Sequence, residues 1–179
     1  MLGSLPFGRD GKMWIMSKLT TILGIDPGYG RCGFGVLVHD GRDWQCKTHG
    51  VITTSKDVAL PSRLKEIADD LTHLIELHKP ERIVIEELFF AKNTTTALNV
   101  SQVRGIVSLL AAQNGIELVE VKPNEVKLAI TGYGRADKKQ VQEMVKTILG
   151  LKTIPKPDDA ADALAVAWTG ANKLQIDSR

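Results

Sequence analysis

Three segments with the pattern of β-strands follow one another within residues 20–54, and their spacing limits how they can pair. The first runs from about Thr21 to Asp26, the second from about Cys32 to His39, and the third covers "KTHGVITT". The "HDGRD" segment before the third contains the Asp-Gly pair typical of a hairpin turn. Because a parallel connection needs a dozen or more residues, these short connections predict an antiparallel meander.

The rest of the chain alternates helical and strand patterns. In "LPSRLKEIADDLTHLIELHKP", apolar residues recur at helical spacing, with Ser62 as the expected N-cap and Pro80 as the stop. The segments "RIVIEELFF" and "IELVEV" predict strands, and helices are expected over residues 94–115, 123–131, 138–149 and 157–174. This order predicts an α/β domain over residues 20–172, with a mixed five-stranded sheet flanked by helices on both faces. A leader (residues 1–19) and a C-terminal tail (residues 173–179) are expected outside it.

Composition narrows the class of protein only slightly. With 23 basic and 21 acidic residues among 179, the net charge of +2 is too small to indicate a nucleic-acid partner by itself. Cys32 and Cys46 lack the spacing of a zinc site and the density of a disulfide scaffold, so we expect reduced thiols in a cytoplasmic protein. No apolar run approaches the roughly 20 residues that span a bilayer, and the leader lacks the apolar core of a signal peptide.

Acidic residues stand where apolar segments begin or end. Asp26 ends the first strand, and Glu86 and Glu87 lie within an apolar strand. Asp159 and Asp162 are spaced i, i+3 on one face of the last helix. Taken singly, they are explained as a turn residue, a solvated strand end and a capped helix. A buried unpaired carboxylate is costly, however, and clustered acids repel one another without a cation, so a metal site is the competing hypothesis.

The types of donor select the cation in that hypothesis. Carboxylate oxygens, without Cys or His at ligand spacing, favour Mg²⁺ or Mn²⁺. Paired metals serve in-line displacement at phosphorus, so the substrate would be a phosphodiester. The segment "VKPNEVKLAITGYGRADKKQ" offers basic groups for it, with a solvated charged face as the alternative: Lys122, Lys127, Arg135, Lys138 and Lys139. Phe89 and Phe90 are candidates to stack on unpaired bases, with core packing as the alternative that is expected for one of the two.

Five motifs, taken together and in order, resemble the RuvC family of Holliday-junction resolvases. They are "GIDPG", "IVIEELFFAKN", "ALNVSQVRG", "VKLAITGYGRADKKQVQ" and "DDAADALAVA", and the resemblance runs from about Ile22 to Trp168. It implies an RNase H-like fold and a homodimeric endonuclease that nicks four-way DNA junctions symmetrically in recombination and repair. The expected products carry 5′-phosphate and 3′-hydroxyl ends. A branch-migration motor of RuvA and RuvB is the implied partner.

The resemblance also assigns roles to residues. It implies that Asp26, Glu86, Asp159 and Asp162 hold two Mg²⁺ ions, with Asp159 favoured over Asp158. Phe89 falls on the aromatic residue that probes the junction, and Lys127 and Lys138 fall on lysines that contact DNA. Arg135 joins these DNA-binding candidates through its place in the basic segment.

Three other functions compete with this interpretation. "GIDPG" also resembles the phosphate loop of actin-like kinases, but 179 residues do not hold the second lobe such a kinase needs. A ribonuclease of hybrid duplexes would use the same chemistry, and a junction-binding protein without catalysis would not need the full set of acids.

The helix over residues 94–115 is apolar on more than one stripe, which fits either an internal helix or one that also packs on a partner subunit.

Overall fold

The computed structural model describes residues 20–88 and 94–177, which form a five-stranded sheet and its flanking helices. The strands are β1 (Thr20–Asp26), β2 (Arg31–His39), β3 (Trp44–Thr53), β4 (Arg82–Glu86) and β5 (Glu117–Val121). The helices are α1 (Leu60–His78), α2 (Thr94–Gln113), α3 (Pro123–Thr131), α4 (Lys138–Ile148) and α5 (Asp158–Asp177). Across the sheet the strands lie in the order β3-β2-β1-β4-β5.

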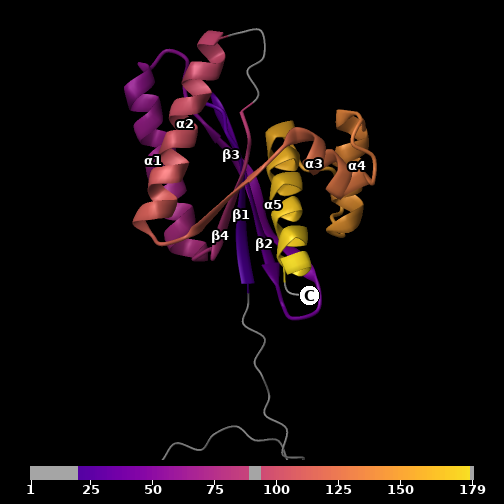
Figure 1. The fold of residues 1–179 in the computed structure, drawn as a ribbon. Helices are drawn as coiled ribbons and strands as arrows, with labels where there is room; N and C mark the ends of the chain where they lie inside the picture. The colour runs from indigo at the N-terminus through magenta and orange to yellow at the C-terminus, as the bar shows by residue number, and fades with distance from the viewer. Residues whose placement is uncertain (1–19, 89–93, 178–179) are drawn as a thin grey trace, which may run out of the picture.

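The strand directions confirm the predicted mixed sheet. β1, β2 and β3 pair antiparallel as a meander, whereas β4 pairs parallel with both β1 and β5. The parallel connections run through α1 and α2, which lie on one side of the sheet, while α3, α4 and α5 lie on the other (Figure 1). This arrangement places the carboxyl ends of β1 and β4 next to each other.

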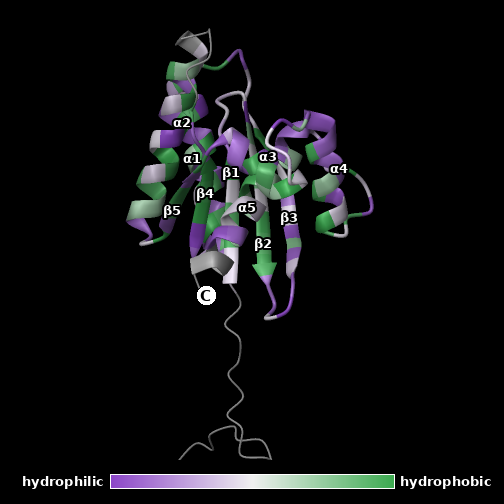
Figure 2. Ribbon diagram, turned by 45° about the vertical axis from the view of Figure 1, so that its right-hand side comes forward, coloured by the Kyte–Doolittle hydropathy of each residue, from purple (hydrophilic) through white to green (hydrophobic). Residues whose placement is uncertain are grey.

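The core fills both faces of the sheet. Leu23 packs with Ile67 of α1 and Val103 of α2, whereas its neighbour Ile22 packs in the cluster that contains Leu164 of α5. Successive side chains of a strand point to opposite faces, which explains why the apolar run of β1 is buried on both sides. In Figure 2 the hydrophobic colour is concentrated on β2 and β4, and the edge strand β3 is more hydrophilic.

Helix α1 begins earlier than the sequence pattern suggested. Ser62 was the expected N-cap, but the helix starts at Leu60 and its N-cap is Ala59, which makes no side-chain capping bond. Pro61 lies in the first turn, where its fixed φ suits a helix and its missing N–H is not needed. The prediction of Ser62 as the cap was therefore wrong, because the preference of Pro for the first turn outweighed the preference of Ser for the cap.

Other boundaries also differ from expectation, and β4 is one of them, because it ends at Glu86 and leaves Glu87 outside the strand that was expected to contain it. β3 begins at Trp44, because the pairing with β2 continues to the end of the hairpin, where Trp44 lies opposite His39 and contacts its ring. At the other end of the chain, α5 extends to Asp177, beyond the expected end of the domain at residue 172.

Both cysteines are free thiols, as expected from their spacing. Burial raises the pKa of Cys32 to about 12 and that of Cys46 to about 11, so neither is a reactive thiolate near neutral pH. Among the helices that the structure describes, none is both long enough and apolar enough to cross a membrane.

Candidate metal and nucleic-acid site

Asp26 and Glu86 end two neighbouring parallel strands. The register of β1 and β4 runs from Ile22 opposite Arg82 to Ile25 opposite Ile85, and the next residue of each strand is one of the two acids. Both side chains are partly buried at the carboxyl ends of their strands, the edge of an α/β sheet where sites are commonly built.

Helix α5 approaches the same strand ends at backbone contact. A Cβ added at Gly24 would lie 2.4 Å from the carbonyl oxygen of Ala163, and one added at Gly33 would lie 2.1 Å from that of Asp159. Only glycine in the strands permits this approach, and the fully buried alanines of "DAADALAVA" keep the facing helix surface small. The first turns of α5 are thereby held over β1 and β2, with Asp159 and Asp162 at this end of the sheet.

The charges of the four acids are coupled. The pKa of Asp26 rises from its ordinary 3.8 to about 7, chiefly through burial and then through the charges of Asp162, Glu86 and Asp159. Burial also raises the pKa of Glu86, with a further contribution from Asp162, and it raises the pKa of Asp162. Acids from β1, β4 and α5 thus lie close enough to repel one another.

A cleft of about 220 Å³ opens beside three of these acids. Asp26, Glu86 and Asp162 line it together with the cationic side chains of Lys127 and Lys138, and apolar residues of α3, α4 and α5 complete the wall. Lys127 lowers the pKa of Glu86, opposing burial, and Lys138 does the same for Asp26. The cleft therefore combines carboxylates with the cations that a phosphodiester would need.

Two cations form ion pairs with acids of the site. Nζ of Lys138 lies 2.9 Å from Oδ2 of Asp162, and Nε of Arg31 lies 3.2 Å from Oδ2 of Asp159. That Asp159 oxygen is buried and accepts no hydrogen bond from the described residues, although Arg31 lies at ion-pair distance from it. In the described part of the chain, no three His, Cys, Asp or Glu side chains converge closely enough to hold a metal ion. The acids gather at one end of the sheet without meeting at a common point.

The remaining candidates take different positions. Arg135 is exposed in the loop between α3 and α4, close in sequence to Lys138 at the start of α4. Asp158 is ion-paired with Lys156 at 3.1 Å, and this pairing lowers the pKa of Asp158. Nζ of Lys138 lies 3.7 Å from Oδ2 of Asp158. Phe89 falls outside the described residues.

Two arginines near the acids were missed by sequence reasoning. Arg31 pairs with Asp159, and Arg104 of α2 donates hydrogen bonds to the main-chain carbonyl of Glu86 and to the carboxylate of Glu120. A basic residue within the apolar stretch "VRGIVSLLAA" was an indication for Arg104. No pattern in the sequence predicted the contact of Arg31 with Asp159, which lies in a helix more than a hundred residues later.

The architecture defines a class of protein before any comparison of sequence. A five-stranded mixed sheet with three antiparallel strands first, helices on both faces and acids at the ends of β1, β4 and the start of α5 is an RNase H-like fold. The family model described as "Crossover junction endodeoxyribonuclease RuvC" matches residues 22–170. The chain belongs to the RuvC family.

Individual relatives agree with that assignment. The chain is 50% identical over 147 residues to the crossover junction endodeoxyribonuclease RuvC of Pseudothermotoga lettingae, covering 82% of this chain and 91% of the relative. It is 51% identical to the RuvC of Thermosipho melanesiensis, covering 82% and 94%. Among solved structures, Thermus thermophilus RuvC in complex with a Holliday junction substrate matches with a TM-score of 0.84 at 33% identity, covering 88% of this chain and 96% of that chain.

Proposed function

We propose that this protein is a cytoplasmic, Mg²⁺-dependent endonuclease that resolves four-way DNA junctions during homologous recombination and repair. It makes paired symmetric nicks that leave 5′-phosphate and 3′-hydroxyl ends. The observation that carries the proposal is the gathering of four mutually repelling acids, from β1, β4 and α5, three of which line a cleft together with Lys127 and Lys138. The RuvC family, to which the chain belongs, consists of metal-dependent nucleases.

The acids suit a divalent cation by their chemistry. They offer only carboxylate oxygens, and Asp26 carries a raised pKa because burial and three like charges leave its ionised form poorly compensated. In the proposal Asp26, Glu86, Asp159 and Asp162 hold two Mg²⁺ ions, for which Mn²⁺ substitutes. When bound, such ions supply an activated water and charge stabilisation for the leaving 3′ oxygen.

The protein's own groups prepare the site for that cation. Since Asp162 is paired with Lys138 and Asp159 with Arg31, both acids must exchange these partners before they act as ligands. The released ammonium of Lys138 and the nearby Lys127 then face the cleft, where they neutralise phosphates of the DNA. Arg135 extends this basic surface, and Phe89 is proposed to stack on bases at the junction centre.

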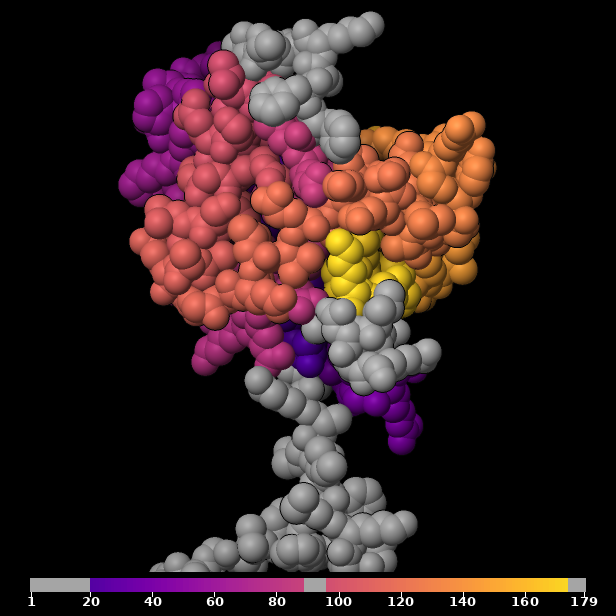
Figure 3. Space-filling view, in the orientation of Figure 1, coloured from indigo at the N-terminus to yellow at the C-terminus, as the bar shows by residue number. Residues whose placement is uncertain are grey.

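A second copy of the chain is part of the proposal, because a two-fold dimer offers two sites to a junction of matching symmetry. Its interface is the outer face of α2. Val103, Val107, Leu110 and Ala111 are buried on the sheet side, while Leu98 and Leu109 remain 61% and 56% exposed. Figure 3 shows α2 in pink at the surface of the molecule. The RuvA–RuvB motor is the proposed partner assembly that delivers junctions.

The proposed function is tested by comparing three substrates: a synthetic four-way junction, a linear duplex and an RNA–DNA hybrid. Each is incubated with Mg²⁺ or with EDTA, using wild type and Asp26→Asn. We expect symmetric, ligatable nicks in the junction alone, lost with EDTA and with the variant. Binding without nicking would instead describe a junction-binding protein, and cleavage of the hybrid alone would describe a ribonuclease of the same fold. Undiminished cleavage by Asp26→Asn would refute the assigned site.

A further inference from the structure

Arg104 connects helix α2 to the end of β4 that carries Glu86. Its Nη1 donates a hydrogen bond to the main-chain carbonyl oxygen of Glu86, and its Nη2 donates to Oε1 of Glu120 on β5 at 2.7 Å. The Arg104 side chain is only 16% exposed. One guanidinium thus bridges the last residue of β4 and the neighbouring strand β5, in the fork geometry that only arginine offers.

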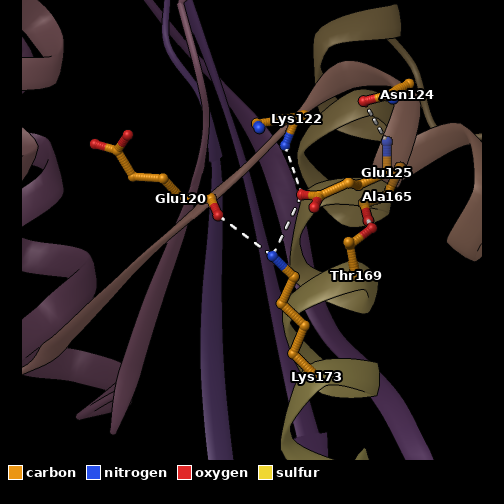
Figure 4. Close-up of polar contacts among 7 residues, drawn as sticks. All are labelled: Glu120, Lys122, Asn124, Glu125, Ala165, Thr169 and Lys173. Carbon is orange, nitrogen blue, oxygen red and sulfur yellow. Dashed lines mark hydrogen bonds and ion pairs between the residues drawn. The ribbon is translucent and has the colours of Figure 1, made fainter.

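Glu120 is held from the opposite side as well. Nζ of Lys173 on α5 lies 3.5 Å from the main-chain carbonyl oxygen of Glu120 and 3.3 Å from Oε2 of Glu125. That Glu125 oxygen also accepts a hydrogen bond from the backbone N–H of Lys122 at the start of α3. Figure 4 shows the Glu120 carboxylate pointing away from Lys173 while its carbonyl faces that lysine. Lys173 therefore holds the backbone of Glu120, and the Glu120 carboxylate points to the side from which Arg104 approaches.

Hydrogen bonds hold the peptide group that follows Glu86 at both of its polar ends. The parallel register of β4 and β5 ends at Glu86 opposite Val121, and the next backbone N–H, that of Glu87, donates to the carbonyl oxygen of Val121 at 2.8 Å. The Arg104 hydrogen bond holds the Glu86 carbonyl of the same peptide group, so the two bonds together fix its plane. Fixing that plane sets the direction in which the Glu86 side chain leaves the strand.

We propose that Arg104 is a positioning residue for Glu86, held in place by Glu120. This inference rests on the proposed function, in which Glu86 is a metal ligand. Outer-shell partners of metal ligands typically contribute 10–100-fold to metal affinity or activity, and Arg104 occupies such a place. Its consequence is specific: loss of Arg104 impairs metal binding and cleavage, but not recognition of the junction.

The chain supplies a matched control at the other end of the same two strands. Arg82, at the start of β4, donates to Oε2 of Glu117, at the start of β5, at 2.9 and 2.6 Å. The Arg82 and Glu117 side chains are 9% and 58% exposed, against 16% and 46% for Arg104 and Glu120. The Arg82 pair joins a buried arginine, and the Arg104 pair a partly buried one, to a half-exposed glutamate of β5, but of the two only Arg104 touches Glu86.

The test uses the full chain and the variants Arg104→Gln, Arg104→Lys, Glu120→Gln and Glu117→Gln. Mn²⁺ binding without DNA is measured by the electron paramagnetic resonance of free Mn²⁺, and junction affinity in EDTA by fluorescence anisotropy. Single-turnover cleavage is followed across Mg²⁺ concentrations. For Arg104→Gln we expect Mn²⁺ binding and the cleavage rate to fall about 10–100-fold, with junction affinity unchanged. Glu120→Gln should reduce Mn²⁺ binding and the cleavage rate by a smaller factor. Arg104→Lys should retain more of both than Arg104→Gln does.

Each outcome separates this role from a general loss of structure. If Arg104→Gln binds Mn²⁺ and cleaves like wild type, the positioning role is refuted while the proposed function stands. If Glu117→Gln reduces Mn²⁺ binding and cleavage as much as Glu120→Gln does, the effect comes from the strand pair as a whole and the positioning role is refuted. The role is also refuted if Arg104→Lys binds Mn²⁺ and cleaves no better than Arg104→Gln. If wild type neither binds Mn²⁺ through Asp26 nor nicks the junction, both the proposed function and the positioning role of Arg104 are refuted.

Discussion

Replacing Asp26 by asparagine should stabilise the metal-free protein while abolishing its cleavage of junctions. Asp26 ends β1 among three other acids, and among the described residues no cation forms an ion pair with it. Asparagine has nearly the same shape and carries no charge. The substitution therefore removes the repulsion and the cost of burying an ionised carboxylate, together with the proposed metal ligand.

The size and pH dependence of the gain follow from the pKa. In the folded protein the pKa of Asp26 is about 7, against an ordinary value of 3.8. The folded state thus holds more protons between these values, and the free energy of unfolding falls as the pH rises from about 4 to about 7. At about 1.4 kcal/mol per pKa unit, the full cost of ionisation reaches about 4 kcal/mol above pH 7. Since the asparagine amide is itself partly buried, we expect a net gain of about 1–3 kcal/mol at pH 8.

Thermal unfolding in EDTA at pH 8 and at pH 5 measures this gain. About 2–4 °C per kcal/mol is typical for a chain of this size, so Asp26→Asn should melt several degrees above wild type at pH 8 and show a smaller advantage at pH 5. Added Mg²⁺ should narrow the difference, because a ligand at 100 times its Kd stabilises wild type by about 2.7 kcal/mol and the variant should not bind it. Asp158→Asn is the control, since Asp158 is paired with Lys156 and its pKa is lowered.

One result would refute the reasoning directly. If Asp26→Asn melts at or below the wild-type temperature at pH 8 without metal, Asp26 is not a poorly compensated charge in the folded protein. A stabilisation shared equally by Asp158→Asn would show that any loss of negative charge on this chain has the same effect, and the particular environment of Asp26 would not be responsible.

Three further substitutions test the packing of α5, the ion pair of Asp159 and the basic wall of the cleft. Gly24→Ala should lower the free energy of unfolding by about 1–3 kcal/mol, because the added methyl would lie 2.4 Å from a backbone carbonyl oxygen of α5. Urea unfolding measures this beside Gly134→Ala, where the nearest atom would be 3.7 Å away, and equal stabilities would contradict the backbone contact. Arg31→Gln should strengthen Mn²⁺ binding without DNA by releasing Asp159, whereas unchanged or weaker binding by isothermal titration calorimetry would count against an exchange of partners. Lys127→Gln should reduce the slope of log junction affinity against log salt by about 0.9 in fluorescence anisotropy, and an unchanged slope would remove Lys127 from the DNA contacts.

The sheet was predictable because its local rules agree with the final fold. Short connections forced β1, β2 and β3 into a meander, and the helical segments before β4 and β5 required parallel crossovers. Asp26 was noticed because a carboxylate at the end of a buried strand conflicts with the cost of desolvation. The raised pKa of Asp26 agrees with that conflict.

What the sequence did not reveal depends on contacts between distant segments. The ion pair of Arg31 with Asp159 exists because Gly33 lets the start of α5 lie against β2, a closeness that no local pattern encodes. Arg104 meets Glu86 only because α2 packs over the β4–β5 edge. Ser62 failed as a cap for the opposite reason, since a second local preference, that of Pro61 for the first turn, was stronger.

These contacts suggest how one site reconciles folding with function. Lys138 and Arg31 neutralise Asp162 and Asp159 from exposed positions, with side chains 56% and 59% exposed. Water can therefore solvate these two basic side chains when a metal ion displaces them from the acids. Arg104 is 16% exposed and binds a main-chain carbonyl, which leaves the Glu86 carboxylate available. The exposed Lys138 and Arg31 are therefore suited to exchange, and the partly buried Arg104 is suited to fix geometry. The same distinction predicts that Lys138→Gln and Arg31→Gln change metal affinity in the opposite direction from Arg104→Gln.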